Sequence, residues 1–204
     1  MGEKSHSSST FPKQLESINQ SMRLFHEKLR EQFVRQLFTI GYEGADVEQL
    51  LATLRNVGIE VLADVRELPL SRKRGLSKRG LAESLRQVGI DYAHYRQLGD
   101  PKPGRDAAKS GDYETFERVF LEHLDTEEAQ ESLSDLLEVA RVKKTCILCF
   151  ERCAHVCHRS YIADLAAAAG FEIYNLVADR PEKYLKDGLK IPRYNPRQSL
   201  AAAE

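Results

Sequence analysis

The sequence predicts a single α/β domain, built on a mainly parallel sheet of about five strands flanked by helices, with an N-terminal helical extension. Two observations support this fold class. Short apolar segments of strand length alternate with amphipathic segments in which apolar residues recur every three or four positions. Glycines follow several amphipathic segments, as expected where a helix ends before the next strand. The 204 residues are enough for one domain of ordinary size with extensions.

The first part of the chain precedes the domain. Residues 1–10 are polar and rich in serine, and we expect them to be disordered. In residues 11–35 the apolar side chains recur in steps of three and four, which predicts one amphipathic helix. We expect this helix to dock on the domain. A dimerisation or partner helix is the alternative, and it would make the protein a homodimer.

The first half of the domain, which spans residues 36–178, contains three predicted strands and two predicted helices. Asp46 is placed to cap the first helix, which ends at Gly58. Ser77 is placed to cap the second helix, which ends at Gly89. The strands are expected at residues 36–40, 59–63 and 90–95.

The second half begins with residues 100–111, which are rich in proline and glycine and are predicted to form a loop. A continuous apolar segment at residues 145–150 predicts a central parallel strand. Three helices are expected in this half, at residues 112–124, 126–141 and 156–169. The last strand is expected at residues 171–177. Residues 179–204 form a basic tail with interleaved tyrosines, for which we favour a packed or solvated segment over one that binds nucleic acid.

Composition and charge limit the functions open to the protein. The formal net charge is −1, so any contact with nucleic acid requires a local basic patch. No segment reaches about 18 consecutive apolar residues, the length that spans a membrane. The first ten residues lack the apolar core of a signal peptide. We therefore expect a cytoplasmic protein without a membrane partner.

All four cysteines lie close together in the sequence, at Cys146, Cys149, Cys153 and Cys157. A disulfide framework would spread its cysteines along a small secreted chain. The clustering instead indicates reduced thiols, which also favours the cytoplasm. Catalytic, redox or metal-binding use of these thiols competes with simple burial in the core.

Residues with reactive side chains follow the predicted strands. In a parallel sheet the carboxyl ends of the strands meet at one edge, where ligands bind. The strand ends bring to this edge Tyr42, Asp64, Arg66, His94, Cys149, Glu151, Cys157, His158 and Arg159. The sequence therefore predicts a functional site at the carboxyl edge of the sheet, although a purely structural role for His94 is equally weighted.

A basic loop follows the second predicted strand, because residues 66–79 contain six basic side chains and one acidic one. Arginine presents forked donors that suit phosphate, and a helix beginning near Ser77 adds positive potential. The loop is predicted to bind an anion or phosphate, and the residues expected to do so are Arg66, Ser71, Arg72 and Arg74. The alternative is a solvated loop in which Asp64 and Arg66 form a structural pair.

The turn after the fourth strand is interpreted first as a catalytic turn. In this interpretation Cys149 or Cys157 is the nucleophile, since a thiol near a helix start and beside histidine and arginine is more easily ionised. Glu151 and His158 would transfer protons, and Arg159 would hold an anion.

Two other interpretations of this turn remain open. Cys153 and Arg159 have the C-x5-R spacing of a phosphatase-like loop, but the loop lacks the glycines that allow tight wrapping of a phosphate. A zinc or iron–sulfur site would use the clustered cysteines with His155 or His158. Cys146 is then a core residue, because it and Cys149 project from opposite faces of a strand.

Short motifs occur in a specific order and spacing through residues 37–177. They are Thr39–Gly41, Asp64–Arg66, Pro69 with Ser71–Arg72, Ser77–Lys78, Gly89–Ile90 with Tyr92 and His94, Leu98–Gly99, and Cys149-x-Glu151 with Cys157–Arg159. Together they resemble an uncharacterised family, the domain of unknown function 488. Ala154 stands where this family commonly has proline, and Cys153 is not a usual family position.

The resemblance implies the α/β fold and no particular reaction. It marks as the site Asp64, Arg66, Cys149, Glu151, Cys157, His158 and Arg159.

Together these observations favour an enzyme that acts on a phosphate-bearing substrate, either a nucleic acid or a nucleotide. The catalytic residues would be Cys149, Glu151, Cys157 and His158. The substrate would be contacted by Tyr42, Asp64, Arg66, Ser71, Arg72, Arg74, His94 and Arg159. The first alternative is a non-catalytic module that binds nucleic acid, and the second is a metal-supported structural protein. The sequence identifies no cofactor.

Overall fold

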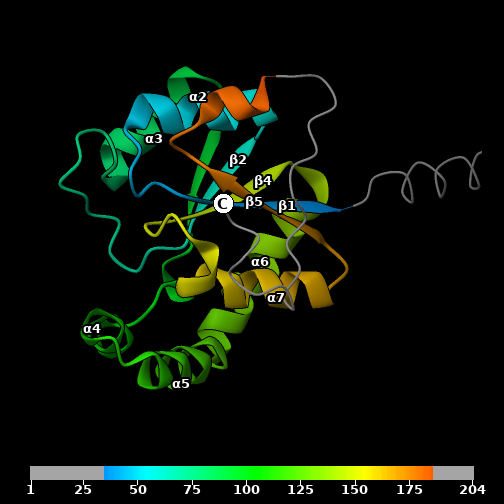
Figure 1. The fold of residues 1–204 in the computed structure, drawn as a ribbon. Helices are drawn as coiled ribbons and strands as arrows, with labels where there is room; N and C mark the ends of the chain where they lie inside the picture. The colour runs from blue at the N-terminus through cyan, green and yellow to red at the C-terminus, as the bar shows by residue number, and fades with distance from the viewer. Residues whose placement is uncertain (1–34, 186–204) are drawn as a thin grey trace, which may run out of the picture. The chain divides into compact units, whose positions relative to one another are not determined.

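The computed structural model describes residues 35–185, which are built around a sheet of five parallel strands (Figure 1). The spatial order of the strands is β3-β2-β4-β1-β5. Their bounds are β1 (Gln36–Gly41), β2 (Val61–Asp64), β3 (Asp91–His94), β4 (Thr145–Cys149) and β5 (Glu172–Val177). The predicted α/β fold is therefore confirmed, and the strand at residues 145–150 is central, as predicted. Because all five strands are parallel, their carboxyl ends form one edge of the sheet.

Helices cover both faces of the sheet, as Figure 1 shows. On one face lie α2 (Val47–Val57) and α3 (Lys78–Gln87). On the other face lie α4 (Lys102–Ser110), α5 (Tyr113–Leu124), α6 (Glu127–Val142) and α7 (Arg159–Ala168). Each face has its own apolar core, so alternate residues of a central strand serve different cores.

The alternation along β4 separates two of the cysteines. Cys146 and Leu148 belong to the core beneath α2 and α3, whereas Ile147 belongs to the core on the opposite face. Cys146 is fully buried there, which confirms the expectation that it is a core residue. Cys149, three positions further, shares the face of Ile147 and ends the strand at the carboxyl edge.

The predicted helix caps are confirmed in part. Asp46 accepts a hydrogen bond from the backbone of Gln49, and Gly58 ends α2 with a left-handed φ of 76°. Ser77 precedes α3, but its hydroxyl does not cap the helix. The Ser77 hydroxyl instead donates to the Ser71 carbonyl at 3.1 Å and accepts from the Ser71 amide at 3.0 Å. Ser77 thus closes the basic loop on itself.

Residues 100–111 correct the sequence prediction, because they contain helix α4 rather than a continuous loop. Pro101 occupies the N-cap position, and Pro103 lies in the first turn, where a missing amide hydrogen breaks no helical bond. Gly111 then ends the helix with a φ of 81°. The prolines and glycine that favoured a loop therefore mark the two ends of a helix.

Smaller differences concern where elements begin. The second strand starts at Val61 rather than at residue 59, and the third spans only Asp91–His94. The helix expected from residue 156 starts at Arg159, after a short 3-10 helix at Ala154–Val156. This later start matters because it leaves Cys157 and His158 in the turn before α7.

The expected N-terminal helix and the polar segment before it lie outside the described residues, as does most of the basic tail. The described start of the tail forms a short 3-10 helix, Pro181–Tyr184. Its Tyr184 hydroxyl accepts a hydrogen bond from the Val177 amide at 3.0 Å, and Asn56 of α2 donates to the Pro181 carbonyl at 2.9 Å. Within residues 35–185, no helix combines the length and apolarity needed to cross a membrane.

Candidate functional site

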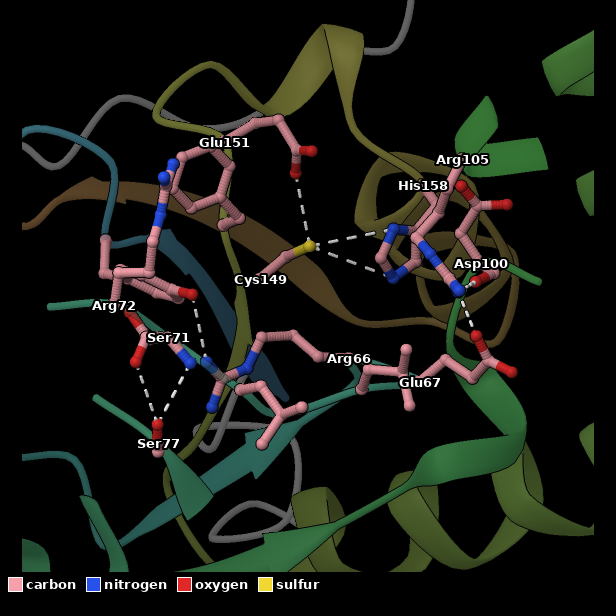
Figure 2. Close-up of a pocket in the computed structure, with 14 residues that line it drawn as sticks. Arg66, Glu67, Ser71, Arg72, Ser77, Asp100, Arg105, Cys149, Glu151 and His158 are labelled. Atoms are coloured by element: carbon pink, nitrogen blue, oxygen red, sulfur yellow. Dashed lines mark hydrogen bonds and ion pairs between the residues drawn. The ribbon is translucent and has the colours of Figure 1, made fainter. Parts of the chain in front are cut away.

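A pocket of about 510 Å³ lies at the carboxyl edge of the sheet. Figure 2 shows the side chains that line it. They come from the ends of β1, β2 and β4, from the basic loop, and from the starts of α4 and α7. The predicted site residues among them are Tyr42, Arg66, Ser71, Arg72, Cys149, Glu151 and His158. The sequence therefore predicted correctly that these side chains lie together.

Cys149 presents its thiol at this pocket. Its sulfur lies 3.2 Å from the Glu151 carboxylate, to which it donates, and 3.7 Å from Nδ1 of His158 (Figure 2). The residue is 4% exposed, so its remaining access to solvent is through the pocket. A thiol between a carboxylate and an imidazole has two groups within reach that can accept its proton.

His158 is held by the neighbouring strand. Its Nε2 lies 3.1 Å from the Val65 carbonyl, just after β2. A carbonyl can only accept, so Nε2 carries the hydrogen of this bond. The Cys149 sulfur lies 3.7 Å from Nδ1 and 3.9 Å from Nε2, so it stands beside the ring between the two nitrogens. This bond holds the position of the imidazole next to Cys149.

Cys157 lies behind Cys149 rather than in the lining of the pocket. Burial raises the pKa of Cys157, but the neighbouring Cys149 thiol and the charges of Arg159 and His158 outweigh it, so the pKa falls well below the usual range. Burial and the neighbouring Cys157 raise the pKa of Cys149 well above it. The pKa values of the two thiols are thus coupled and shift in opposite directions.

The pKa values of Glu151 and His158 are both raised next to these thiols. Burial, followed by the negative charge of Cys157, raises the pKa of Glu151 to about 7. Burial lowers the pKa of His158, but the charges of Cys157 and Glu151 outweigh it and raise the pKa. At neutral pH Glu151 is therefore able both to take and to give a proton.

Arg159 was predicted to contact substrate, and the structure places it elsewhere. The residue is 0% exposed and does not line the pocket. Its Nη1 donates to the Glu151 carbonyl at 2.6 Å and its Nη2 to the Arg152 carbonyl at 3.1 Å, so the guanidinium holds the turn after β4. This use of Arg159 also argues against the phosphatase-like loop with Cys153, because the guanidinium is turned away from any ligand.

The backbone of this turn packs directly on β1. A Cβ at Gly41 would lie only 1.7 Å from the Glu151 carbonyl oxygen, so only glycine fits at the end of β1. The turn that carries Glu151 can therefore pack on β1 only because the Thr39–Gly41 motif ends in glycine.

Asp64 and Arg66 form the structural pair that was the alternative for the basic loop. Two guanidinium nitrogens of Arg66 donate to the Asp64 carboxylate, at 2.8 and 2.5 Å. Arg66 also donates to the Tyr42 hydroxyl at 3.1 Å and to the Leu76 carbonyl at 3.0 Å. Asp64 accepts a further hydrogen bond from Tyr92 at 2.6 Å and is fully buried outside the lining. The prediction that Asp64 contacts substrate is therefore wrong. Asp64 instead holds the side chain of Arg66, which does line the pocket.

The remaining predicted residues divide between the pocket and its surroundings. Ser71 and Arg72 line the pocket, and Arg72 is exposed. Arg74 is exposed on the same loop but does not line the pocket. His94 is also outside the lining, where Nε2 lies 2.9 Å from the Arg66 carbonyl and Nδ1 lies 2.9 Å from the Lys78 ammonium. His94 thus supports the basic loop. This is the structural role that the sequence analysis gave as the alternative for this residue.

Three charged residues of the pocket were missed by the sequence analysis: Glu67, Asp100 and Arg105. Arg105 forms an ion pair with Glu67 and also donates to the Asp100 carbonyl. Asp100 is 5% exposed, and its Oδ1 makes no hydrogen bond within the described part of the chain. Burial raises the pKa of Asp100 to about 6. Asp100 and Arg105 both lie in residues 100–111, for which the sequence predicted only a loop.

The comparisons with known proteins agree with the motifs. A family model described as "Domain of unknown function DUF488" matches residues 46–166, and the chain therefore belongs to this family. The match includes every residue of the pocket except Tyr42. No curated protein and no solved structure matches the chain.

Proposed function

We propose that the protein is an enzyme that acts on a phosphate-bearing substrate, with Cys149 as its nucleophile. The observation that carries this proposal is the position of the Cys149 sulfur at the pocket, 3.2 Å from the Glu151 carboxylate and 3.7 Å from the His158 ring. A thiol next to a fixed base, in a pocket of the size that holds a small ligand, is the arrangement that nucleophilic catalysis requires.

The proposed reaction is a hydrolysis in two steps. Glu151 accepts the Cys149 proton, and the sulfur forms a bond to the electrophilic atom of the substrate while that atom loses its bond to the leaving group. The leaving group takes the proton from Glu151. A water molecule then attacks the same atom, and its proton passes through Glu151 back to the departing sulfur. His158, fixed on the Val65 carbonyl, is the second group in reach of this proton.

Arg72 is the arginine of the pocket best placed to bind the phosphate. Arg66 and Arg105 also line the pocket, but each is engaged in an ion pair, with Asp64 and Glu67 respectively. Arg72 is exposed on the basic loop, whose end leads into the start of α3. Forked donors and a helix start both favour a phosphate group. A nucleotide and the end of a nucleic acid both supply one.

The exposure of the basic loop also supports a second candidate, a module that binds nucleic acid without chemistry. The exposed cations of this loop and of the start of α3 are Arg72, Lys73, Arg74, Lys78 and Arg79. Binding through several phosphates releases counterions, so its affinity would fall steeply with added salt. The enzyme and the binding module therefore differ in turnover and in salt dependence.

The experiment is a turnover assay of the reduced full chain with nucleotides, short oligonucleotides and simple phosphate esters. We expect Cys149→Ala to lower turnover by at least about 1,000-fold while binding is retained. Arg72→Ala should weaken binding, and Cys153→Ala is the matched control that should leave both unchanged. Unchanged turnover in Cys149→Ala would remove the nucleophile from the proposal. Binding that is steeply salt-dependent, with no turnover of any compound, would favour the second candidate.

A further inference from the structure

Three buried side chains with metal-binding atoms meet where β4 ends. The sulfurs of Cys149 and Cys157 and a ring nitrogen of His158 all lie within 4.8 Å of one another. We propose that these three residues form a binding site for a thiophilic divalent cation of the Zn²⁺ class. The proposal goes beyond the catalytic function and does not depend on it, because it requires only that the three ligands close on one ion.

The ligand types fit such an ion. Two thiolates and one imidazole form a sulfur- and nitrogen-rich set, which suits Zn²⁺ and not the oxygen-seeking Mg²⁺ or Ca²⁺. Each coordinated sulfur binds as a thiolate, so a thiol that enters the site releases its proton to solvent. No oxidant or reductant takes part.

His158 is already oriented as a metal ligand. Its Nε2 hydrogen is donated to the Val65 carbonyl at 3.1 Å, so Nδ1, which lies 3.7 Å from the Cys149 sulfur, is the nitrogen that can bind an ion once its proton is released. Metal-binding histidines commonly donate their other ring nitrogen to a carbonyl or carboxylate in this way, which fixes the tautomer before the ion binds. This contact is independent of the clustering of the three ligands.

The fourth coordination position would face the pocket. Cys149 and His158 both line the pocket, whereas Cys157 lies behind them. The Glu151 carboxylate, 3.2 Å from the Cys149 sulfur, is the nearest oxygen for that position or for a water bound there. Three protein ligands with an accessible fourth position are typical of zinc sites that exchange ligands, whereas structural sites have four protein ligands.

The structure narrows the metal interpretation of the clustered cysteines. Cys146 belongs to the core on the opposite face of the sheet, and Cys153 is outside the group of three. A sulfur bound to a cation cannot attack a substrate. The metal-bound and catalytic states of Cys149 therefore exclude each other, so the cation would inhibit the proposed reaction.

The test is titration of the reduced, metal-free full chain with Co²⁺, followed by displacement with Zn²⁺. We expect thiolate-to-cobalt charge-transfer absorption that saturates at one ion per chain and disappears when Zn²⁺ is added. Loss of even an outer partner costs about 10- to 100-fold in metal affinity, so Cys149→Ser and Cys157→Ser should each weaken binding by more than about 100-fold. Cys153→Ser is the matched control and should bind as the wild type does.

A second measurement uses the wild-type chain alone, so it does not depend on whether the variants fold. Zn²⁺ should protect Cys149, but not Cys153, from alkylation by iodoacetamide, and a chelator should remove the protection. Absence of the charge-transfer absorption in the wild type, or protection of Cys153 instead, would overturn the proposal. Cobalt binding without turnover of any substrate would support the metal site and count against the proposed enzyme. Failure of the metal site and failure of the proposed function can therefore be told apart.

Discussion

Two buried arginines, Arg66 in the loop after β2 and Arg159 at the start of α7, have different partners for their positive charges. Arg66 follows β2 and donates twice to the carboxylate of Asp64. Arg159 follows β4 and donates to two backbone carbonyls, of Glu151 and Arg152, and to the Thr39 hydroxyl at 3.4 Å. A buried charge requires compensation, and carbonyl oxygens supply only partial charges.

The difference bears on the reactivity proposed for the turn after β4. Asp64 supplies a full negative charge to Arg66, so that pair is complete and inert. Arg159 receives its compensation from the sulfur of Cys157, whose pKa it lowers together with Cys149 and His158. The charge of Arg159 therefore lowers the pKa of a thiol that lies next to Cys149 but outside the lining of the pocket.

The largest loss of stability is expected when the ion pair between Asp64 and Arg66 is broken. Asp64→Asn leaves Arg66 buried without its counter-charge, and we expect a loss of about 3–5 kcal/mol in the free energy of unfolding. Urea denaturation measures this loss. Asp46→Asn is the matched control, because Asp46 caps α2 at the surface and asparagine caps a helix equally well. Equal, small losses in both variants would show that the pair is not required.

Removal of the second arginine should destabilise the protein less and also change its chemistry. Arg159→Met leaves the Glu151 and Arg152 carbonyls without their donors, at a cost of about 3 kcal/mol in the free energy of unfolding. The pKa of Cys157 should rise, because a positive charge that lowers it is lost. Ultraviolet absorption by thiolate should then develop at higher pH than in the wild type, whereas Arg118→Met, at an exposed ion pair, should change neither property. An unshifted absorption profile in Arg159→Met would contradict this explanation of the lowered pKa of Cys157.

The third prediction concerns the pH dependence of stability. Burial raises the pKa of Asp100 to about 6 from an ordinary value of 3.8. The folded state therefore favours the protonated form, and its stability falls as pH rises from about 4 to about 6. The charged groups that face Asp100 are His158, Arg105, Cys157 and Glu67.

Asp100→Asn should remove this slope and make the variant more stable than the wild type at pH 7, by about 1–3 kcal/mol. Urea denaturation at several pH values measures the difference. If the two proteins lose stability in parallel as the pH rises, Asp100 is not the group responsible.

The smallest effect on stability is expected at the exposed arginine of the pocket. Arg72→Ala should change the free energy of unfolding by less than about 0.5 kcal/mol, because the side chain is exposed and outside the buried pairs. The same variant should weaken binding of inorganic pyrophosphate, measured by calorimetry, whereas Arg74→Ala, outside the lining, should weaken it less. Equal effects of the two variants would indicate general attraction by the basic loop rather than a phosphate site.

Much of the fold was predictable because local patterns determine it. The apolar segment of β4, the cap at Asp46 and the terminating Gly58 act within a few residues of where they stand. The convergence of Cys149 with Arg66 was also predictable, because parallel strands place their carboxyl ends at one edge.

The parts that the sequence did not predict depend on direction and on long-range partners. Arg159 follows His158 directly, yet a step of about 100° along a helix turns one side chain to the pocket and the other to the sheet. Arg105 was missed because its partner Glu67 is 38 positions away in the sequence. No local pattern reports either relationship.

The account depends most on Cys149 being a reactive thiol that faces the pocket. The most direct measurement is the rate of iodoacetamide alkylation of each cysteine in the reduced, metal-free chain, assigned by peptide mass analysis. We predict that Cys149 is alkylated in the folded chain despite its raised pKa, and that Glu151→Gln slows Cys149 without changing the more exposed Cys153. Modification of Cys149 only after the protein is denatured, or an equal rate in Glu151→Gln, would contradict the proposal.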